Sequence, residues 1–285
     1  MATQTYDFTT EDVEYLRHGS TGLTARLYKP EGAGPFPAVI DLHGGAWNRG
    51  DLTGTQGQDE ALARSGIFVA SLNFRHAGDG YPTSLVDINY ATRWLKANAK
   101  KFNINPNKIG IGGASSGGHL AMLSAMRPND PRYAAAPLPP GSPAVDASVQ
   151  CVAMSWPVIN PISRYRNAIR RSQEANPPEW SIGMKDRHDT YWKTEAAMIE
   201  GNPMTILEKG EKVQLPPALW LQPRPDDVHD YHDPEGGFPG NEPERFVSNY
   251  RKAGGDIEIA YVPAEGRNGP LGYDRVVQFY HKHLG

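Results

Sequence analysis

The sequence contains a single cysteine, Cys151, and no apolar run of the roughly 18 residues that a membrane-spanning helix needs. One thiol cannot form an internal disulfide, so disulfide-stabilised folds are excluded. Its place in the apolar run VQCVAMSW indicates a buried core residue rather than a nucleophile. The N-terminus lacks a basic start followed by an apolar stretch, so we expect no signal peptide and no membrane span, and a reducing cytoplasm fits.

No sign of charge dominates the chain either. The 29 Lys and Arg side chains nearly balance 32 Asp and Glu side chains, for a net charge of -3, which argues against nucleic acid as a partner. With 285 residues and 39% apolar side chains, the chain can bury a full core. Because α/β folds of this size often form one unit, we expect a single domain over residues 1–285 with an insertion, rather than two domains.

What is present is an alternation of short apolar runs with helical patterns. The first two β-rich runs, VEYLRH and LTARLYKP, predict an antiparallel pair. The later runs are almost continuously apolar, as strands buried on both faces are. We therefore predict an α/β fold with a mostly parallel sheet and helices on both faces. The predicted later strands cover residues 37–43, 66–74, 108–113, 149–156, 217–222 and 256–263.

Two stretches interrupt the alternation. Residues 127–148 are too rich in proline for regular structure and predict an ordered surface loop. Residues 157–216 separate two predicted core strands and predict a cap. The aromatic side chains of this cap can pack it against the sheet or face a substrate, and both roles stay open; they are Tyr165, Trp180, Tyr191 and Trp192.

The pattern G-x-S-x-G, residues 113–117, lies between a predicted strand and the helical pattern GGHLAML. A sharp turn from strand to helix forces its central residue into a strained backbone conformation, and the neighbours two positions away must be nearly without side chains. Gly113 and Gly117 meet that requirement. The pattern predicts that Ser115 is a nucleophile at the N-terminus of a helix, where developing negative charge is favoured.

A glycine-rich loop follows the predicted strand PAVIDL. In the run HGGAW, residues 43–47, the backbone N–H groups of Gly44 and Gly45, with that of Ser116, can hold a carbonyl oxygen as it becomes an oxyanion. We expect His43 to support this loop rather than to act as a base. The run thus predicts an oxyanion hole beside Ser115.

These motifs, with the segment LNFRHAGDGYPTSLVDINYATRWLKANAKKF between them, resemble the α/β-hydrolase superfamily, in particular esterases, lipases and arylformamidases. The resemblance covers residues 12–284 and implies an eight-stranded sheet, a helical cap and a triad in the chain order Ser, acid, His. It places the acid after the strand PALWLQ, at Asp226, with Asp227 as the alternative. Trp47 and the aromatic cap suggest a medium-sized apolar or aromatic acyl substrate.

The resemblance also implies a histidine in the loop after the last strand, and this chain has none there. The loop AEGRNGPLG offers Arg267, which stays protonated, and Asn268, which has no useful basicity. A serine hydroxyl is a poor nucleophile unless a neighbour accepts its proton. The missing residue therefore decides whether the chain can be an ordinary serine hydrolase.

Two histidines in the loop after the preceding strand are the candidate replacements. His229 and His232 follow Asp226 by three and six residues, on the side of the sheet where Ser115 is expected, and we take His229 as the predicted base. His119 is expected to have a supporting role close behind Ser115. His281 and His283 near the end of the last helix are expected on the surface.

The same loop is dense in potential metal ligands. Six such side chains within eight residues could bind a divalent ion. Two histidines three positions apart on irregular backbone do not define a coordination geometry, however, so we prefer the interpretation of a charge-rich surface loop without metal. The six side chains are Asp226, Asp227, His229, Asp230, His232 and Asp233.

Two functions fit these features. The first is a carboxylesterase-type serine hydrolase acting on ester, amide or related acyl bonds of a small molecule, with an unconventional or missing base and no cofactor. The second is a non-hydrolytic protein of the same fold, a binding protein or an isomerase or lyase, in which the oxyanion loop only polarises a carbonyl. The persistence of Ser115, the oxyanion loop and Asp226 favours hydrolysis.

Overall fold

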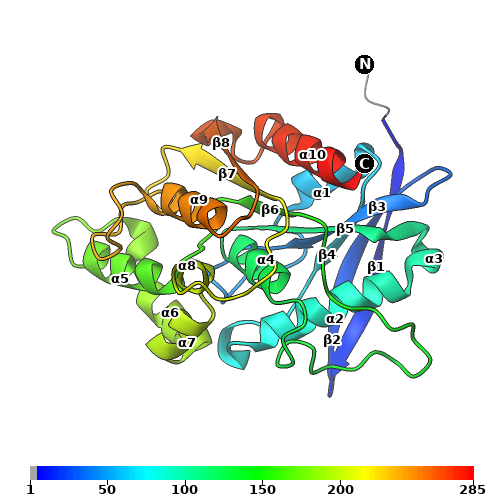
Figure 1. Ribbon diagram of the computed structural model, residues 1–285, viewed down its shortest axis with the longest axis horizontal. Helices are drawn as coiled ribbons and strands as arrows, with labels where there is room; N and C mark the ends of the chain where they lie inside the picture. Colours follow the sequence, from blue (N-terminus) through cyan, green and yellow to red (C-terminus); the bar gives the residue numbers. More distant parts are fainter. Residues whose placement is uncertain (1–4) are drawn as a thin grey trace.

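An eight-stranded sheet forms the centre of the computed structural model, which describes residues 5–285 (Figure 1). The strand order is β1-β2-β4-β3-β5-β6-β7-β8. The expected antiparallel opening pair is present, β2 also pairs antiparallel with β4, and all later pairs are parallel. The strands are β1 (Phe8–His18), β2 (Thr21–Pro30), β3 (Phe36–Leu42), β4 (Phe68–Leu72), β5 (Ile104–Ala114), β6 (Val152–Ser155), β7 (Ala218–Arg224) and β8 (Ile257–Pro263).

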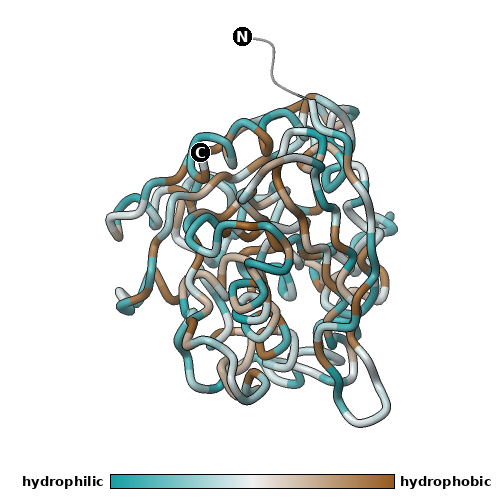
Figure 2. The backbone as a smooth tube through the Cα atoms, turned by 90° about the vertical axis from the view of Figure 1, so that its right-hand side faces the viewer, coloured by the Kyte–Doolittle hydropathy of each residue, from teal (hydrophilic) through white to brown (hydrophobic). Residues whose placement is uncertain are grey.

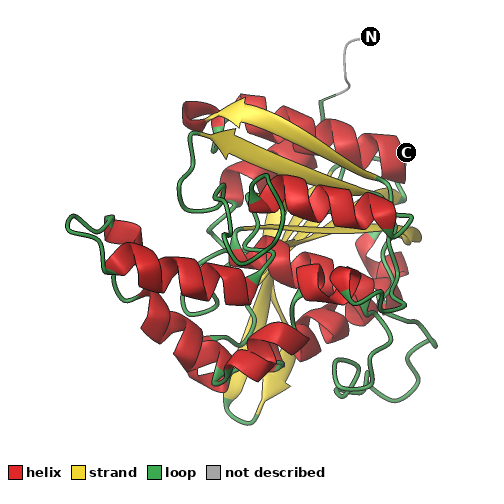
Figure 3. Cartoon of the chain, turned by 60° about the vertical axis from the view of Figure 1, so that its left-hand side comes forward, coloured by secondary structure: helices red, strands yellow, loops and turns green. Residues whose placement is uncertain are grey.

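Helices cover both faces of this sheet, as the near-continuous apolar strands predicted. Helices α1 (Gln56–Arg64) and α10 (Pro270–Leu284) lie together on one face. The other face carries α2 (Thr83–Ala97), α3 (Ala99–Phe102), α4 (Ser116–Met126) and α9 (Glu242–Lys252). Figure 3 shows the helices packed around the strands. Figure 2 shows hydrophobic stretches in the interior of the molecule and hydrophilic ones at its periphery.

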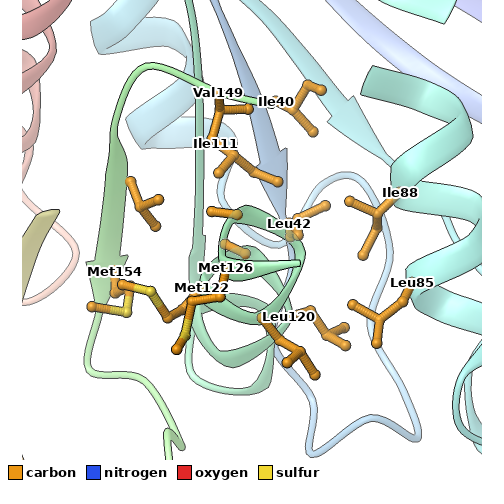
Figure 4. Close-up of a cluster of buried hydrophobic side chains, with 14 of the residues drawn as sticks. Ile40, Leu42, Leu85, Ile88, Ile111, Leu120, Met122, Met126, Val149 and Met154 are labelled. Carbon is orange, nitrogen blue, oxygen red and sulfur yellow. The ribbon is translucent and has the colours of Figure 1, made fainter. Parts of the chain in front are cut away.

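The core is densest where α4 lies against the sheet. Figure 4 shows Leu120 and Met122 of this helix among side chains of the central strands and of α2. Every residue of α4 is buried, because the helix is enclosed by the sheet, α2 and α8 (Pro203–Glu208). A helix embedded in this way is a rigid support for the residue at its N-terminus, which is Ser115.

Residues 156–217 connect β6 to β7 and contain the segment that was expected to form a cap. They form α5 (Pro161–Ser172), α6 (Met184–Trp192), α7 (Glu195–Glu200) and α8. In Figure 1, α5, α6 and α7 form the green to yellow-green group to the left of the strands. The proline-rich residues 127–148 contain neither helix nor strand, as expected.

The sequence predicts a helix over residues 84–102 and a last helix that begins near Tyr273, and the structure differs from both expectations and adds one helix. Helix α1 was not predicted, because the side it buries includes Gln58 and Asp59 and so breaks the apolar spacing of an amphipathic helix. The helical pattern over residues 84–102 is interrupted at Asn98 into α2 and α3. The last helix begins at Pro270 rather than near Tyr273, since proline is favoured in the first turn.

Two expectations about apolar segments can be compared with the structure directly. Cys151 is buried, as its apolar surroundings predicted, and burial raises the pKa of its thiol. Within residues 5–285, no helix combines the length and the apolar character needed to cross a bilayer.

Candidate active site

Ser115 occupies the sharp turn between β5 and α4. Its backbone has φ 53° and ψ -118°, a conformation that costs a non-glycine residue free energy and persists only where its surroundings enforce it. Two backbone hydrogen bonds hold it there. The N–H of Ser115 donates to the carbonyl of Ser155 (2.9 Å), and the carbonyl of Ser115 accepts from the N–H of Val158 (3.0 Å). The turn holds the serine at the wall of a cavity.

The glycines at the flanks of this turn are required by close backbone contacts. A Cβ atom added to Gly113 would lie 2.6 Å from the carbonyl oxygen of Leu42, and one added to Gly117 would lie 2.1 Å from the same atom. Both distances are impossible for real side chains, so the turn and β3 can pack together only with glycine at both positions. The spacing of the G-x-S-x-G pattern therefore has the physical cause that the sequence suggested.

His229 lies directly beside the Ser115 hydroxyl. The Nε2 atom of His229 is 3.0 Å from Oγ of Ser115, and its Nδ1 atom is 2.9 Å from Oδ2 of Asp226. The Asp226 carboxylate also accepts hydrogen bonds from the backbone N–H groups of Val228 and His229 (3.1 and 3.2 Å). The structure thus brings Ser115, His229 and Asp226 into one hydrogen-bonded chain, although the histidine does not follow the last strand.

His229 is buried, with 6% of its surface exposed, instead of being solvated as most loop histidines are. Burial lowers its pKa below the ordinary value, the hydrogen bond and charge of Asp226 oppose this, and the positive charges of Arg164 and Arg267 add to the lowering. For Asp226, burial acts to raise the pKa, but the hydrogen bond to His229 and the charges of His229 and Arg267 outweigh it, so the pKa is lowered. At neutral pH the pair is a neutral imidazole beside a carboxylate.

The alternative residues in this loop are directed elsewhere. Asp227 accepts a hydrogen bond from the indole N–H of Trp180 (3.1 Å), and its side chain is largely exposed. The ring of His232 is exposed, with Nδ1 3.0 Å from the carbonyl oxygen of Gly240. Neither residue contacts Ser115 or the ring of His229, so the structure favours Asp226 over Asp227 and His229 over His232.

The rings of the other histidines of interest form no hydrogen bond with Ser115. His119 is buried, accepts a hydrogen bond from the Trp47 indole at Nδ1 (3.3 Å) and donates from Nε2 to the carbonyl of Gly201 (2.8 Å). Burial lowers the pKa of His119 to about 4, so it stays neutral at ordinary pH. His281 and His283, expected on the surface, are only partly exposed.

The glycine-rich loop after β3 adjoins the turn at Ser115. A Cβ atom added to Gly44 would lie 3.2 Å from the Cβ atom of Ser115, and Gly45 adopts φ 121°, a conformation that favours glycine. Within residues 5–285, the N–H groups of Gly44, Gly45 and Ser116 have no hydrogen-bond acceptor. These three donors are therefore available to an oxygen atom bound beside Ser115.

His43 supports this loop, as expected. Its ring stacks on Phe74 with centroids 4.3 Å apart, and its Nδ1 donates to the carbonyl of Gly44 (2.8 Å). Burial lowers its pKa to about 4, so it remains a neutral support. Trp47, which was expected to contact substrate, lies at the cavity wall but is only 2% exposed. Its ring packs against His119 of α4 and against three aromatic rings of the insertion, those of His188, Tyr191 and Trp192.

Ser115 and His229 open into a cavity of about 690 Å³. Arg267 and Asn268 line it, so the loop after β8 does reach the site even though it carries no histidine. Arg164, on α5, also lines the cavity, and this was not predicted because the run RYRNAIRR is typical of a solvated helix face. Among residues 5–285, no group of three or more His, Cys, Asp or Glu side chains is arranged to hold a metal ion.

Comparison with solved structures identifies the fold as that of the α/β hydrolases. The carboxylesterase EstE1, cloned from a metagenomic library, superposes with a TM-score of 0.72 at 20% identity, over 100% of this chain and 92% of EstE1. An esterase from Pyrobaculum calidifontis superposes with a TM-score of 0.71 at 21% identity, over 97% of this chain and 85% of that protein.

Sequence comparison defines the family. The BD-FAE family model matches residues 26–218, and the chain belongs to that family. It is 34% identical over 143 residues to the probable carboxylic ester hydrolase LipM of Mycobacterium tuberculosis, covering 49% of this chain and 32% of LipM. It is 30% identical over 207 residues to the versiconal hemiacetal acetate esterase of Dothistroma septosporum, covering 71% of this chain and 56% of that enzyme. The chain therefore spans between about a third and about a half of the length of these relatives.

Proposed function

We propose that this protein is a serine hydrolase that cleaves carboxylic esters of small molecules. The observation that carries the proposal is the chain of short contacts from Ser115 through His229 to Asp226. A serine becomes a competent nucleophile when a base lies within hydrogen-bonding distance and a third group orients that base. The similarity to proteins named as ester hydrolases supports the choice of an ester over other acyl bonds.

In the proposed reaction, the Ser115 hydroxyl donates its proton to Nε2 of His229 while its oxygen attacks the ester carbonyl. The carbonyl oxygen becomes negative and accepts hydrogen bonds from the backbone N–H groups of Gly44, Gly45 and Ser116. His229 then passes the proton to the departing alcohol, leaving an acyl group on Ser115. Water then attacks the acyl-enzyme and gives one proton to Nε2 of His229. As the tetrahedral intermediate collapses, His229 returns that proton to the Ser115 oxygen and the carboxylic acid is released, so that one water is consumed for each ester.

Asp226 has an orienting role in this scheme. Its carboxylate accepts the hydrogen bond from Nδ1–H of His229, which keeps the lone pair of Nε2 directed at the Ser115 hydroxyl. It also stabilises the imidazolium that forms when the histidine takes the proton. Residues 157–216 act as a cap that walls one side of the cavity, through Trp180 and Met184 among others.

A non-hydrolytic role would fit a protein that lacks a base beside its serine. The position of His229 supplies a candidate for that group, which supports hydrolysis over simple binding or isomerisation. No cofactor is part of the proposal, because general-base catalysis and an oxyanion hole suffice for ester cleavage.

The test is covalent labelling and turnover with one matched variant. A fluorophosphonate probe should label the wild-type protein at Ser115, and 4-nitrophenyl acetate should be hydrolysed. Ser115→Ala should abolish labelling and lower kcat by about 10³-fold or more. Ser116→Ala, which keeps the backbone N–H, is the control and should retain labelling. Binding of esters without turnover or labelling would reject the proposal.

A further inference from the structure

The charged side chains that line the catalytic cavity are mostly arginines. Arg49, Arg164, Arg187 and Arg267 lie at its wall, against one acidic side chain, Glu179. None of the four arginines forms an ion pair within residues 5–285, whereas most arginines elsewhere in that range do. The protein as a whole is slightly acidic, so this concentration of unpaired positive charge is local to the cavity.

Arg164 is the most unusual of the four. It is 3% exposed, its guanidinium lies 4.2 Å above the ring of Trp180, and its Nη1 is shielded from solvent without a hydrogen-bond partner in residues 5–285. Burial lowers its pKa to about 10, so it remains a cation at neutral pH. Burying a charged group without a partner is costly, and structures normally retain such a group only where something compensates it.

Arg267 is arranged in a similar way. Its guanidinium lies 4.3 Å above the ring of Trp156, and it is partly buried at the cavity wall. It belongs to the loop where the resemblance to other hydrolases implied a histidine. Both arginines also lower the pKa of His229, so each lies near the catalytic pair.

The nearby carboxylates are already engaged. Asp226 accepts hydrogen bonds from His229, and Asp227 accepts one from Trp180, on whose ring Arg164 stacks. Both interact with Arg164 through space, but neither lies within 4.0 Å of its guanidinium nitrogens. The donor groups of Arg164 are therefore left for a ligand.

From this arrangement we infer that the substrate ester carries a carboxylate, which Arg164 and Arg267 bind while the ester carbonyl lies between Ser115 and the oxyanion loop. The inference rests on the proposed hydrolytic function and names its substrate class. A planar carboxylate matches the fork of N–H donors on a guanidinium, and such charge-assisted hydrogen bonds are among the strong ones in proteins. Each guanidinium lies over an indole ring, and this cation–π contact helps to hold it in place.

The carboxylate could belong to either half of the ester, and two substrate pairs separate these cases. Mono-4-nitrophenyl adipate carries it on the acyl side, and its neutral match is the 4-nitrophenyl ester of adipic acid monoamide. For the alcohol side, 4-acetoxybenzoate is compared with 4-acetoxybenzamide. We expect kcat/KM to be about 10- to 100-fold higher for the carboxylate in at least one pair, as charge-assisted hydrogen bonds predict. Equal values in both pairs would overturn the inference.

Variants of the arginines test the assignment of residues. Arg164→Met and Arg267→Gln should each reduce kcat/KM for the preferred carboxylate by about 10-fold or more, mainly through KM, and should change the neutral amide by less than about threefold. The control is Arg166→Met on the same helix, because the Arg166 guanidinium pairs with Glu235 away from the cavity. An equal loss for the charged and neutral substrates would show that the arginines matter for structure and not for recognition.

Binding to Ser115→Ala distinguishes failure of this inference from failure of the proposed function. Calorimetry with this variant measures the affinity for the intact carboxylate and amide esters without turnover. Tighter binding of the carboxylate with no turnover by the wild-type protein would support anion recognition and reject hydrolysis. Turnover that depends on Ser115 but shows no preference for the carboxylate would support hydrolysis and reject anion recognition.

Discussion

His229 and Asp226 are three residues apart in one loop, and their side chains meet at 2.9 Å between Nδ1 and Oδ2, almost completely buried. The acid and the base of the proposed triad thus come from a single loop, after β7, instead of from two loops. The carboxylate in addition accepts the backbone N–H of His229 at 3.2 Å. Because Asp226 accepts hydrogen bonds from both the backbone and the ring of His229, the imidazole has little freedom to rotate.

The first prediction concerns the base. His229→Ala should lower kcat for 4-nitrophenyl acetate by about 10²- to 10⁴-fold, because Ser115 loses the group that accepts its proton. His232→Ala is the matched control, since its ring is exposed and forms a hydrogen bond with the carbonyl of Gly240. Steady-state kinetics with both variants measures these effects on kcat. A wild-type kcat in His229→Ala would show that this residue is not the base.

The second prediction concerns the acid. Asp226→Asn should lower kcat by about 10³- to 10⁴-fold, since the amide can donate to Nδ1 and so favour the tautomer with its proton on Nε2. Asp227→Asn should stay within about threefold of the wild-type rate, because Asp227 contacts Trp180 and not His229. A larger loss in Asp227→Asn than in Asp226→Asn would mean that the acid has been misassigned.

The third prediction is the pH dependence of activity. The base acts only when neutral, so kcat/KM should rise with pH through the pKa of His229 and then level off. Because burial and the two arginines lower that pKa, the midpoint should fall below 6.5, the ordinary value for histidine. Arg267→Gln removes one of the lowering charges and should move the midpoint up, as a pH–rate profile would reveal. A wild-type midpoint above 6.5 would contradict the electrostatic description of the site.

The fourth prediction concerns stability, away from the site. Asp41 of β3 and Asp59 of α1 are both fully buried, and burial, together with the charge of Asp41, raises the pKa of Asp59 well above its ordinary value. A carboxyl whose pKa is raised on folding makes the folded state less stable as pH rises above its unfolded value of 3.8, by up to about 1.4 kcal/mol per pH unit.

Asp59→Asn should therefore raise the melting temperature at pH 8, and the gain should shrink at pH 5. Thermal unfolding at the two pH values measures both effects. Asp274→Asn on the exposed side of α10 serves as the control and should leave the melting temperature unchanged. A lower melting temperature for Asp59→Asn at pH 8 would show that the buried pair stabilises the fold.

Much of the site is encoded locally and could be predicted. The requirement for glycine at positions 113 and 117 follows from the geometry of one turn, and the donors at Gly44 and Gly45 follow from one loop. The order of the strands along the chain could also be predicted, because parallel strands buried on both faces are apolar along most of their length. Helix α1 escaped prediction because Asp59, a charged residue in sequence, is buried in the fold.

The arginines could not be predicted in the same way. Arg164 lies in a run of basic residues, and only the packing of α5 against Trp180 reveals that its guanidinium is buried at the cavity while its neighbour Arg166 pairs with surface carboxylates. Which of several neighbouring arginines is buried depends on the contacts of the whole insertion. The local sequence pattern does not distinguish Arg164 from Arg166.

By itself, the sequence determined a mostly parallel sheet, a strained serine turn and a loop of free amide donors, because each of these depends on residues within a few positions of one another. Only the tertiary structure decided which histidine meets that serine. Ser115 and His229 are separated by 114 positions, and they meet because β6 lies between β5 and β7, bringing the ends of those strands to one edge of the sheet.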